Sequence, residues 1–239
     1  MFNKKRKNTK QQKQGTSLIT LTKPSSVITE QIRTIRTNIQ FSMIDRELKT
    51  LVFTSAGPGE GKSTVSANVA VVFAKQGKKV LLVDADMRKP TVHKTFKVPN
   101  NEGLTTLLTE KEMNLENVIK ETVDENLSIL TSGPIPPNPS ELLDSNKMNF
   151  TIEMLASSFD LIIFDMPPIV TVTDAQIMAS KTDGTIVVVR SGIANKEAVL
   201  KAKQLLTIVN ANVVGTVFNG VEKTSDTAYK YYGLEGDQK

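Results

Sequence analysis

Residues 54–64 read Thr-Ser-Ala-Gly-Pro-Gly-Glu-Gly-Lys-Ser-Thr, and this stretch decides the fold. It follows the short apolar run 51–53 and leads into a helical run over residues 62–76, which Gly77 ends. A strand, a glycine-rich turn and a helix are typical of a phosphate-binding loop, in which backbone N–H groups and the positive end of the helix surround phosphate oxygens. The strict pattern has glycine at the place of Ala56, a tolerated variant. A glycine turn without a ligand is the competing interpretation, and the flanking strand and helix weigh against it.

The loop predicts ATP or another nucleoside triphosphate as the ligand. We expect Lys62 to reach the β- and γ-phosphates and the Ser63 hydroxyl to contact Mg²⁺. The predicted nucleotide-binding residues within the loop are Gly57, Gly59, Glu60, Gly61, Lys62, Ser63 and Thr64. This motif alone leaves open what happens to the γ-phosphate.

Length and composition limit the class of protein. A chain of 239 residues is long enough for one large α/β domain and short for two. The absence of cysteine excludes disulfides and zinc–thiolate sites and fits a reducing compartment such as the cytoplasm. The apolar runs have the length of strands, well short of the roughly 18 residues that a membrane span needs. The N-terminus lacks the apolar segment of a secretory signal.

The net charge of +5 comes from one segment. Six basic residues and no acidic residue lie within residues 1–14. Removing these six from the 30 basic residues leaves 24 against 25 acidic residues, so the rest of the chain is close to neutral. We expect residues 1–16 to form a disordered basic arm. Such an arm could contact anionic lipid, nucleic acid or an acidic partner, or serve only as a solubilising tail.

The remaining chain alternates strand-like and helix-like segments. Strands are predicted at 51–54, 80–84, 127–131, 161–165, 185–190 and 213–218, and helices at 26–43, 62–76 and 195–209, with a further helix beginning near Asn138. This order indicates a P-loop NTPase-like fold, a mostly parallel sheet with helices on both faces and ligands at the carboxyl ends of the strands. We expect one domain over residues 17–219 and a mobile tail over residues 220–239.

Acidic residues follow two of the predicted strands. Asp84 ends the run 80–84 and Asp86 follows two residues later. Because residues i and i+2 of an extended backbone point the same way, both can face one site. Asp165 ends the run 161–165, the position at which an acid commonly holds Mg²⁺ together with the Ser of the loop. Each acid alone fits a solvated strand end or a turn. Together with the loop, the three predict a metal–nucleotide site.

Three segments resemble the Walker A, A′ and B boxes of bacterial tyrosine kinases, a branch of the P-loop ATPases related to the ParA/MinD proteins. They are the loop 56–64, the segment 83–88 and the segment 163–167. Residues 30–36 match the E-x-x-R-x-x-R oligomerisation helix of these kinases, and residues 133–139 are also similar to them. ParA/MinD ATPases carry a signature lysine five places before the loop lysine, where this chain has Gly57. That departure favours the kinase branch.

The resemblance implies a catalytic set of Lys62, Asp84 and Asp86. We expect Asp86 to accept the phenol proton and Asp84 to polarise metal-bound water, although these two roles could be reversed. The predicted metal residues are Ser63, Asp84 and Asp165. Asn219 lies where related ATPases read adenine, and Arg88 could stabilise phosphate charge or pair with an acid.

The resemblance also implies an acceptor, the C-terminal cluster Tyr229, Tyr231 and Tyr232, which holds all three tyrosines of the chain. The competing interpretation is that this cluster docks on the domain or in an aromatic groove. Transfer in trans within a ring is implied, assembled through Glu30, Arg33 and Arg36. For these three, an ordinary solvated helix face with an i,i+3 ion pair is the alternative.

As partners, the resemblance implies a separate transmembrane activator that acts through its cytoplasmic tail, a phosphotyrosine phosphatase and protein substrates, without sequence-specific nucleic acid. The chain resembles the split form of these kinases, so we expect a cytoplasmic protein recruited to the inner face of the membrane and serving capsule or exopolysaccharide production. Two other functions stay open. One is a ParA/MinD-like switch ATPase without kinase activity, and the other is a nucleotide-gated scaffold whose output is assembly.

Overall fold

The fold is built on one seven-stranded sheet. The computed structural model describes residues 15–42, 48–110 and 114–221. The strands lie in the order β3-β4-β2-β5-β1-β6-β7. Their bounds are β1 Thr50–Ser55, β2 Val80–Asp84, β3 Ile119–Glu121, β4 Leu127–Leu130, β5 Leu161–Asp165, β6 Gly184–Arg190 and β7 Val213–Asn219. All neighbouring strands run parallel except β3, which is antiparallel to β4. The predicted α/β fold with a mostly parallel sheet is confirmed.

The six predicted strands are all present, within two residues of their expected bounds. Strand β3 was not predicted. It has three residues, Ile-Lys-Glu, none of them buried, at the edge of the sheet. A segment of three residues is too short to show the alternation of apolar and polar side chains that predicts a strand. It forms a strand because β4 offers a free edge with which it can pair.

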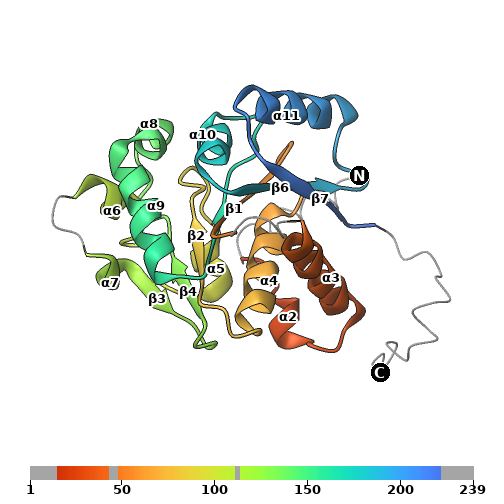
Figure 1. The fold of residues 1–239 in the computed structure, drawn as a ribbon, viewed down its shortest axis with the longest axis horizontal. Coiled ribbons are helices and arrows are strands. Elements are labelled where there is room, and N and C mark those ends of the chain that lie inside the picture. The colour runs from red at the N-terminus through yellow and green to blue at the C-terminus, as the bar shows by residue number, and fades with distance from the viewer. Residues whose placement is uncertain (1–14, 43–47, 111–113, 222–239) are drawn as a thin grey trace, which may run out of the picture.

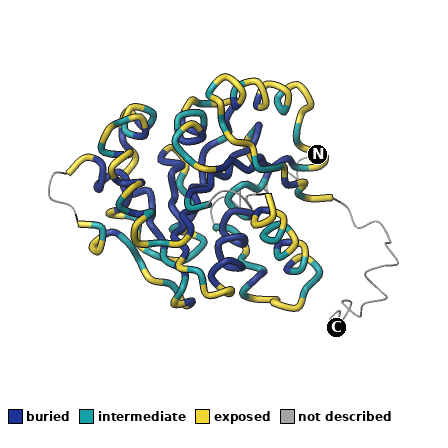
Figure 2. Tube along the Cα trace, in the orientation of Figure 1, coloured by how far each residue is buried: buried dark blue, intermediate teal, exposed yellow. Residues whose placement is uncertain are grey.

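Helices cover both faces of the sheet (Figure 1). The first group packs on one face: α2 Ile19–Thr22, α3 Val27–Phe41, α4 Lys62–Ala74 and α5 Val92–Phe96. The second group packs on the other face: α6 Leu104–Thr109, α7 Leu115–Val118, α8 Pro139–Asp144, α9 Asn146–Ser158, α10 Asp174–Lys181 and α11 Lys196–Ile208. Within β1, Leu51 and Phe53 join the first core and Val52 the second, because successive side chains of a strand alternate between faces. The inner strands β4, β2, β5, β1 and β6 therefore form the buried middle layer, and the edge strands β3 and β7 are more exposed (Figure 2).

Helix α4, which begins at the phosphate-binding loop, lies deep in the first group. Every residue from Val65 to Ala74 is buried, since the sheet covers one side of the helix and α3 packs against another. Asn68 is the one amide among them, and it is fully used. Its oxygen accepts hydrogen bonds from the backbone N–H and the hydroxyl of Thr20, and its nitrogen donates to the carbonyls of Ser17 and Thr64. The segment before α3 is thereby fastened to the helix of the loop.

The predicted helix boundaries agree with the structure to within two residues. The side chains of Ser26 and Asn195 accept hydrogen bonds from backbone N–H groups in the first turns of α3 and α11. Pro139 starts α8, although the Asn138 side chain makes no capping bond to the backbone. No helix in the described part of the chain is long and apolar enough to cross a membrane.

Candidate nucleotide and phosphoryl-transfer site

Three adjacent strands bring the loop and the acids to one edge of the sheet. Strand β5 lies between β1 and β2, and in the sheet register Asp165 stands beside both Phe53 of β1 and Asp84 of β2. The carboxyl ends of these three strands therefore hold the phosphate-binding loop, the A′ acids and the B acid side by side. This is the edge at which ligands bind in parallel α/β sheets.

The backbone of the loop needs glycine at two places. Gly59 and Gly61 have φ angles of +79° and +93°, in the left-handed region that residues with a Cβ rarely adopt. At Gly61 a Cβ would also lie 2.1 Å from the Asn219 amide nitrogen. Gly61 is followed at once by α4, so the free N–H groups of the first helical turn are available to an anion.

Lys62 is held among carboxylates. Its Nζ lies 3.0 Å from Asp86 Oδ2, 3.5 Å from Asp165 Oδ1 and 3.2 Å from Ser63 Oγ. Burial works to lower the pKa of Lys62, but Asp165 and Asp86, together with Asp84, raise that pKa above its usual value. The ammonium group is therefore a permanent cation at the start of α4, and one cation faces three acids.

Asp84 and Asp86 have different surroundings. Asp84 is fully buried, and its Oδ2 accepts hydrogen bonds of 2.9 Å from the N–H groups of Thr91 and Val92 at the start of α5. Its Oδ1 is buried and has no hydrogen-bond partner. Asp86 uses both oxygens, one toward Lys62 and the other toward the Lys89 N–H at 3.0 Å. Burial and the neighbouring Asp165 raise the pKa of Asp84 to about 7, against the effects of the Val92 hydrogen bond and Lys62.

Asp165 is fully buried, and neither carboxylate oxygen makes a hydrogen bond. Burial raises the pKa of Asp165, and the adjacent Lys62 and Ser63 oppose that rise. Asp165 Oδ1 lies 3.5 Å from Lys62 Nζ in an ion pair, so both oxygens keep room for a further ligand. Such oxygens, next to the Ser63 hydroxyl, fit Mg²⁺, which binds one or two carboxylates and keeps the rest of its shell for water and phosphate. Within the described residues, no group of three or more His, Cys, Asp or Glu side chains could hold a metal ion. Water and phosphate would therefore have to complete the coordination of Mg²⁺.

The far side of the loop rests against the ends of β6 and β7. Asn219 donates through its amide to the Glu60 carbonyl at 2.9 Å. The Arg190 side chain donates to the Gly59 carbonyl at 3.4 Å. The Glu60 side chain is 2% exposed and turns inward. The structure thus brings the predicted nucleotide-binding residues together around the loop, with Asn219 packed directly on it.

The family follows from this geometry together with three comparisons. The family model described as AAA domain matches residues 48–212. Tyrosine-protein kinase YwqD of Bacillus subtilis (strain 168) is 48% identical over 219 residues, which cover 92% of this chain and 92% of that protein. The chain belongs to the bacterial tyrosine-protein kinase family. The predicted resemblance is thereby confirmed.

Solved structures place this kinase in the same family. The chimerical protein CapA2B2 superposes with a TM-score of 0.83 at 44% identity, covering 88% of this chain and 94% of that one. The kinase domain of Escherichia coli ETK gives a TM-score of 0.83 at 34% identity, covering 89% and 83%. The cell division ATPase MinD of Pyrococcus furiosus, at 24% identity and a TM-score of 0.62 over 78% and 79%, shares the fold.

Arg88 of the kinase is paired with an acid. Its guanidinium donates two hydrogen bonds of 2.9 Å to the two oxygens of Asp174, which is fully buried in the first turn of α10. This bidentate pair ties the loop after β2 to the segment after β5. Of the two roles considered for Arg88, the contacts favour pairing. Asp174 was missed because helix α10 was not predicted, and a single Asp after Thr173 carries little signal.

The kinase carries the predicted oligomerisation residues Glu30, Arg33 and Arg36 on one helix. All three lie on α3, which packs on α4. Glu30 and Arg33 form an i,i+3 ion pair, and Arg36 donates to the Val72 carbonyl of α4 at 3.3 Å. These contacts are compatible with the alternative of an ordinary helix face, and the role in oligomerisation stays a prediction. Tyr229, Tyr231 and Tyr232 lie outside the described residues, as does most of the basic arm.

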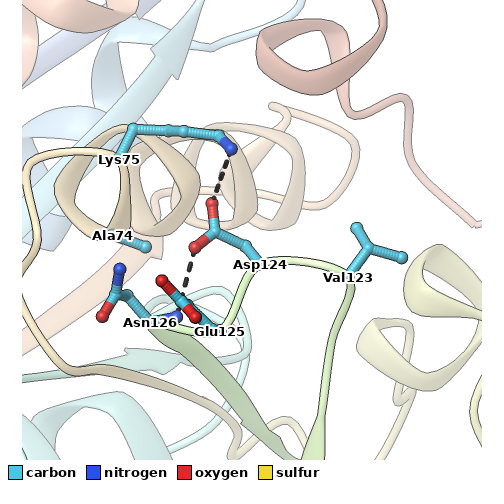
Figure 3. Close-up of a pocket in the computed structure, with 6 residues that line it drawn as sticks. All are labelled: Ala74, Lys75, Val123, Asp124, Glu125 and Asn126. Atoms are coloured by element: carbon cyan, nitrogen blue, oxygen red, sulfur yellow. Dashed lines mark hydrogen bonds and ion pairs between the residues drawn. The ribbon is translucent and has the colours of Figure 1, made fainter.

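A hollow of about 320 Å³ lies at the opposite end of α4 (Figure 3). It is lined by Ala74, Lys75 and residues 123–126. Lys75 pairs with Asp124 at 3.0 Å, and Asp124 accepts a second bond from the Asn126 N–H at 3.2 Å. Helix α4 starts at the phosphate-binding loop and ends at this hollow, so the hollow belongs to the amino-terminal edge of the sheet and is separate from the nucleotide site.

Proposed function

We propose that this kinase transfers the γ-phosphate of ATP to the C-terminal tyrosines Tyr229, Tyr231 and Tyr232. The observation that carries the proposal is the group around Lys62, where one buried ammonium faces Asp86 at 3.0 Å and Asp165 at 3.5 Å beside a loop shaped for phosphate. Phosphoryl transfer needs this combination, because its catalysis is mainly positioning and charge stabilisation.

In the proposed reaction, the loop N–H groups and Lys62 hold and neutralise the β- and γ-phosphates. Mg²⁺, which Ser63 and Asp165 would hold, supplies further neutralisation of the phosphate charge when it is bound. The phenol oxygen forms a bond to the γ-phosphorus while the bond between that phosphorus and the bridging oxygen breaks, which releases ADP. The phenol proton then needs an acceptor at the same edge of the sheet.

The contacts support Asp84 as that acceptor. Its Oδ1 has no partner, whereas both oxygens of Asp86 are engaged, one of them with Lys62. A carboxylate with a pKa of about 7 is also a better base for a phenol than an ordinary aspartate, since the phenol pKa is about 10. We therefore assign the proton to Asp84 and the orientation of Lys62 to Asp86, whereas the sequence led us to expect Asp86 as the base and Asp84 as the group that polarises metal-bound water.

Transfer in trans is part of the proposal. Strand β7 ends at Asn219 on the nucleotide edge, and ten residues separate Asn219 from Tyr229. An extended chain of that length covers up to ~35 Å, enough to reach a neighbouring subunit. The assembly would be a ring joined through Glu30, Arg33 and Arg36 of α3, with Asn219 beside the adenine.

The relatives support a proposal for the cellular setting. We infer that a separate transmembrane activator recruits the kinase to the inner face of the membrane through a cytoplasmic tail. The similar structure of a chimerical protein, CapA2B2, supports a partner of this kind. A phosphotyrosine phosphatase would reverse the reaction, and the output would be control of capsular or extracellular polysaccharide synthesis through the kinase and its protein substrates.

The test is incubation of the purified chain with Mg·ATP, with and without an activator tail, followed by mass spectrometry of the C-terminal peptide. Phosphate on the three tyrosines is expected, and none in Lys62→Met. ADP formation that persists after replacement of all three tyrosines by Phe, with an unmodified wild-type tail, would instead support the switch ATPase. Nucleotide-dependent assembly without turnover would support the scaffold.

A further inference from the structure

Glu60 is an unusual residue of the phosphate-binding loop. The loop is a surface feature, yet Glu60 is 2% exposed. Glutamate is seldom buried unless its oxygens have partners. The catalytic assignment made above gives Glu60 no task, so its burial needs a separate explanation.

The two carboxylate oxygens of Glu60 bind different parts of the chain. Oε1 accepts a hydrogen bond of 2.5 Å from the Gly57 N–H, three residues earlier in the loop. Oε2 accepts one of 3.3 Å from the Arg190 N–H at the end of β6. The side chain therefore closes the loop on itself and fastens it to the sheet.

The backbone and a neighbouring side chain strengthen the same connection. The Glu60 carbonyl accepts from the Asn219 amide at 2.9 Å, so the end of β7 is joined as well. Arg190 in turn donates from its side chain to the Gly59 carbonyl at 3.4 Å. The ends of two strands thus hold one turn of the loop, and Glu60 contributes to both attachments.

The chemistry of Glu60 is specific. A carboxylate offers two acceptor oxygens and no donor, which suits two facing N–H groups. Glutamine has nearly the same shape but would turn an NH₂ group toward one of those donors and leave that donor unpaired. The Gly57 N–H points at Glu60 within the protein, so this amide shapes the loop and is not one of the groups free to bind phosphate.

We propose that Glu60 is a positioning residue that holds the phosphate-binding loop in its nucleotide-receiving shape by bridging Gly57 to the end of β6. A loop ordered in advance loses less conformational freedom when the ligand arrives, so the bridge strengthens nucleotide affinity. Because the hydrogen bonds of Glu60 go to the loop backbone and to the strand ends, its effect falls on binding and leaves the transfer step at saturating ATP nearly unchanged. The inference rests on the proposed function only for the identity of the nucleotide.

The test compares Glu60→Gln with Glu125→Gln, the same chemical change at an exposed residue beside the hollow at the other end of α4. Equilibrium binding of a fluorescent ATP analogue and of the matching ADP analogue is measured on the full chain. We expect Glu60→Gln to raise both dissociation constants about tenfold or more, which corresponds to losing one hydrogen bond to a charged group. Glu125→Gln should bind like the wild type. Because no transfer is needed, the result is independent of whether the tail is the acceptor.

Three further measurements separate positioning from a general loss of structure. Amide hydrogen exchange at Gly57 should be slow in the nucleotide-free wild type and faster in Glu60→Gln, with the amides of β1 unchanged. Glu60→Asp keeps two acceptors and should recover part of the affinity that Glu60→Ala loses. In phosphorylation assays the KM for ATP should rise while kcat changes less than about threefold. Wild-type affinity in Glu60→Gln, or an unprotected Gly57 amide in the wild type, would overturn the proposal.

Discussion

The two ends of helix α4 present the same pair of groups in different settings. At its start, Lys62 lies 3.0 Å from Asp86, and at its end Lys75 lies 3.0 Å from Asp124. The Lys62 side chain is 13% exposed and faces further carboxylates, whereas the Lys75 side chain is 61% exposed and faces one. Both aspartates are nearly buried, so burial of the acid does not distinguish the two ends.

The difference lies in the balance of charge and in the backbone. At the start of α4, three acids face one lysine, so negative charge exceeds positive charge there. At the end of α4, the pair is balanced and borders a hollow that lacks a phosphate-binding loop (Figure 3). A hollow with an ion pair is therefore no evidence for chemistry. Excess buried charge, placed where helix N–H groups are free, is the stronger sign of a nucleotide site.

The largest expected effect is the difference in tyrosine phosphorylation between variants of Lys62 and Lys75. Lys62→Met should reduce tyrosine phosphorylation by a factor of about 10³ or more, because the cation that stabilises transferring phosphate is lost. Lys75→Met should phosphorylate at the wild-type rate. Both are measured as initial rates of phosphotyrosine formation at saturating Mg·ATP. Comparable losses in the two variants would mean that α4 responds as a whole and that the comparison is wrong.

Asp84→Asn should slow the transfer step about 10²- to 10⁴-fold, since a general base contributes about that much. In the wild type the rate should rise as pH increases through about 7, where Asp84 loses its proton, and in the variant this step should disappear. The measurement is single-turnover phosphorylation between pH 5.5 and 8.5. Asp124→Asn, at the other end of α4, serves as the matched control and should keep the wild-type profile. A pH step that persists in Asp84→Asn would return the role of base to Asp86.

The Asp84→Asn variant, which should lose activity, should gain stability at high pH. The pKa of Asp84 is raised in the folded protein, so between about pH 4 and 7 the folded state binds more protons than the unfolded state, and this group's contribution to stability falls as pH rises. Asp84→Asn should therefore raise the unfolding midpoint temperature at pH 8 relative to the wild type, and by less at pH 5. Thermal unfolding at the two pH values measures this, and an equal change at both would refute the assignment.

Removal of the cation from the Arg88–Asp174 pair should be costly. Arg88→Met leaves Asp174 fully buried without its two hydrogen bonds, so we expect a loss of about 3 kcal/mol in the free energy of unfolding. Urea unfolding measures the loss. The double variant Arg88→Met/Asp174→Leu should recover much of it. A loss below 1 kcal/mol would show that Arg88 is a surface residue that does not organise the site.

The smallest effect is the stability of Lys75→Met. Because Lys75 is largely exposed, solvent screens its attraction to Asp124, and the loss should be no more than about 1 kcal/mol. The salt dependence of urea unfolding gives the check, since high salt should remove much of the difference between variant and wild type. A loss as large as that of Arg88→Met would mean that Asp124 depends on Lys75 as a buried charge does.

Much of the fold could be predicted because its signals are local. The buried strands β1, β2 and β5 are continuous apolar runs, and the glycines and lysine of the loop stand in unbroken order between β1 and α4. Where one helix was predicted to begin near Asn138, the structure has two, α8 and α9. Strand β3 and helices α2, α5, α6, α7 and α10 were not predicted. They are short, and neighbours rather than periodicity stabilise them, as the α5 amides that bind Asp84 illustrate.

The candidate site was predicted in its members and not in their division of labour. Lys62, Asp84, Asp86 and Asp165 are recognisable from their positions after strands, since strand ends meet at one edge of a parallel sheet. Which oxygens are free depends on contacts between segments far apart in the chain. The N–H groups of α5 bind one oxygen of Asp84, and Lys62 and the Lys89 N–H bind those of Asp86. No spacing rule encodes that difference.

The order of residues 54–64 between a strand and a helix was enough to establish a nucleotide-binding α/β protein, because the backbone conformation of such a loop is determined locally by its glycines. The inward turn of Glu60, the pairing of Arg88 with Asp174 and the packing of Asn219 on Gly61 each join residues more than 80 positions apart. These contacts exist only once the sheet has brought the strand ends together, since burial there makes each polar atom depend on the particular partner that folding supplies.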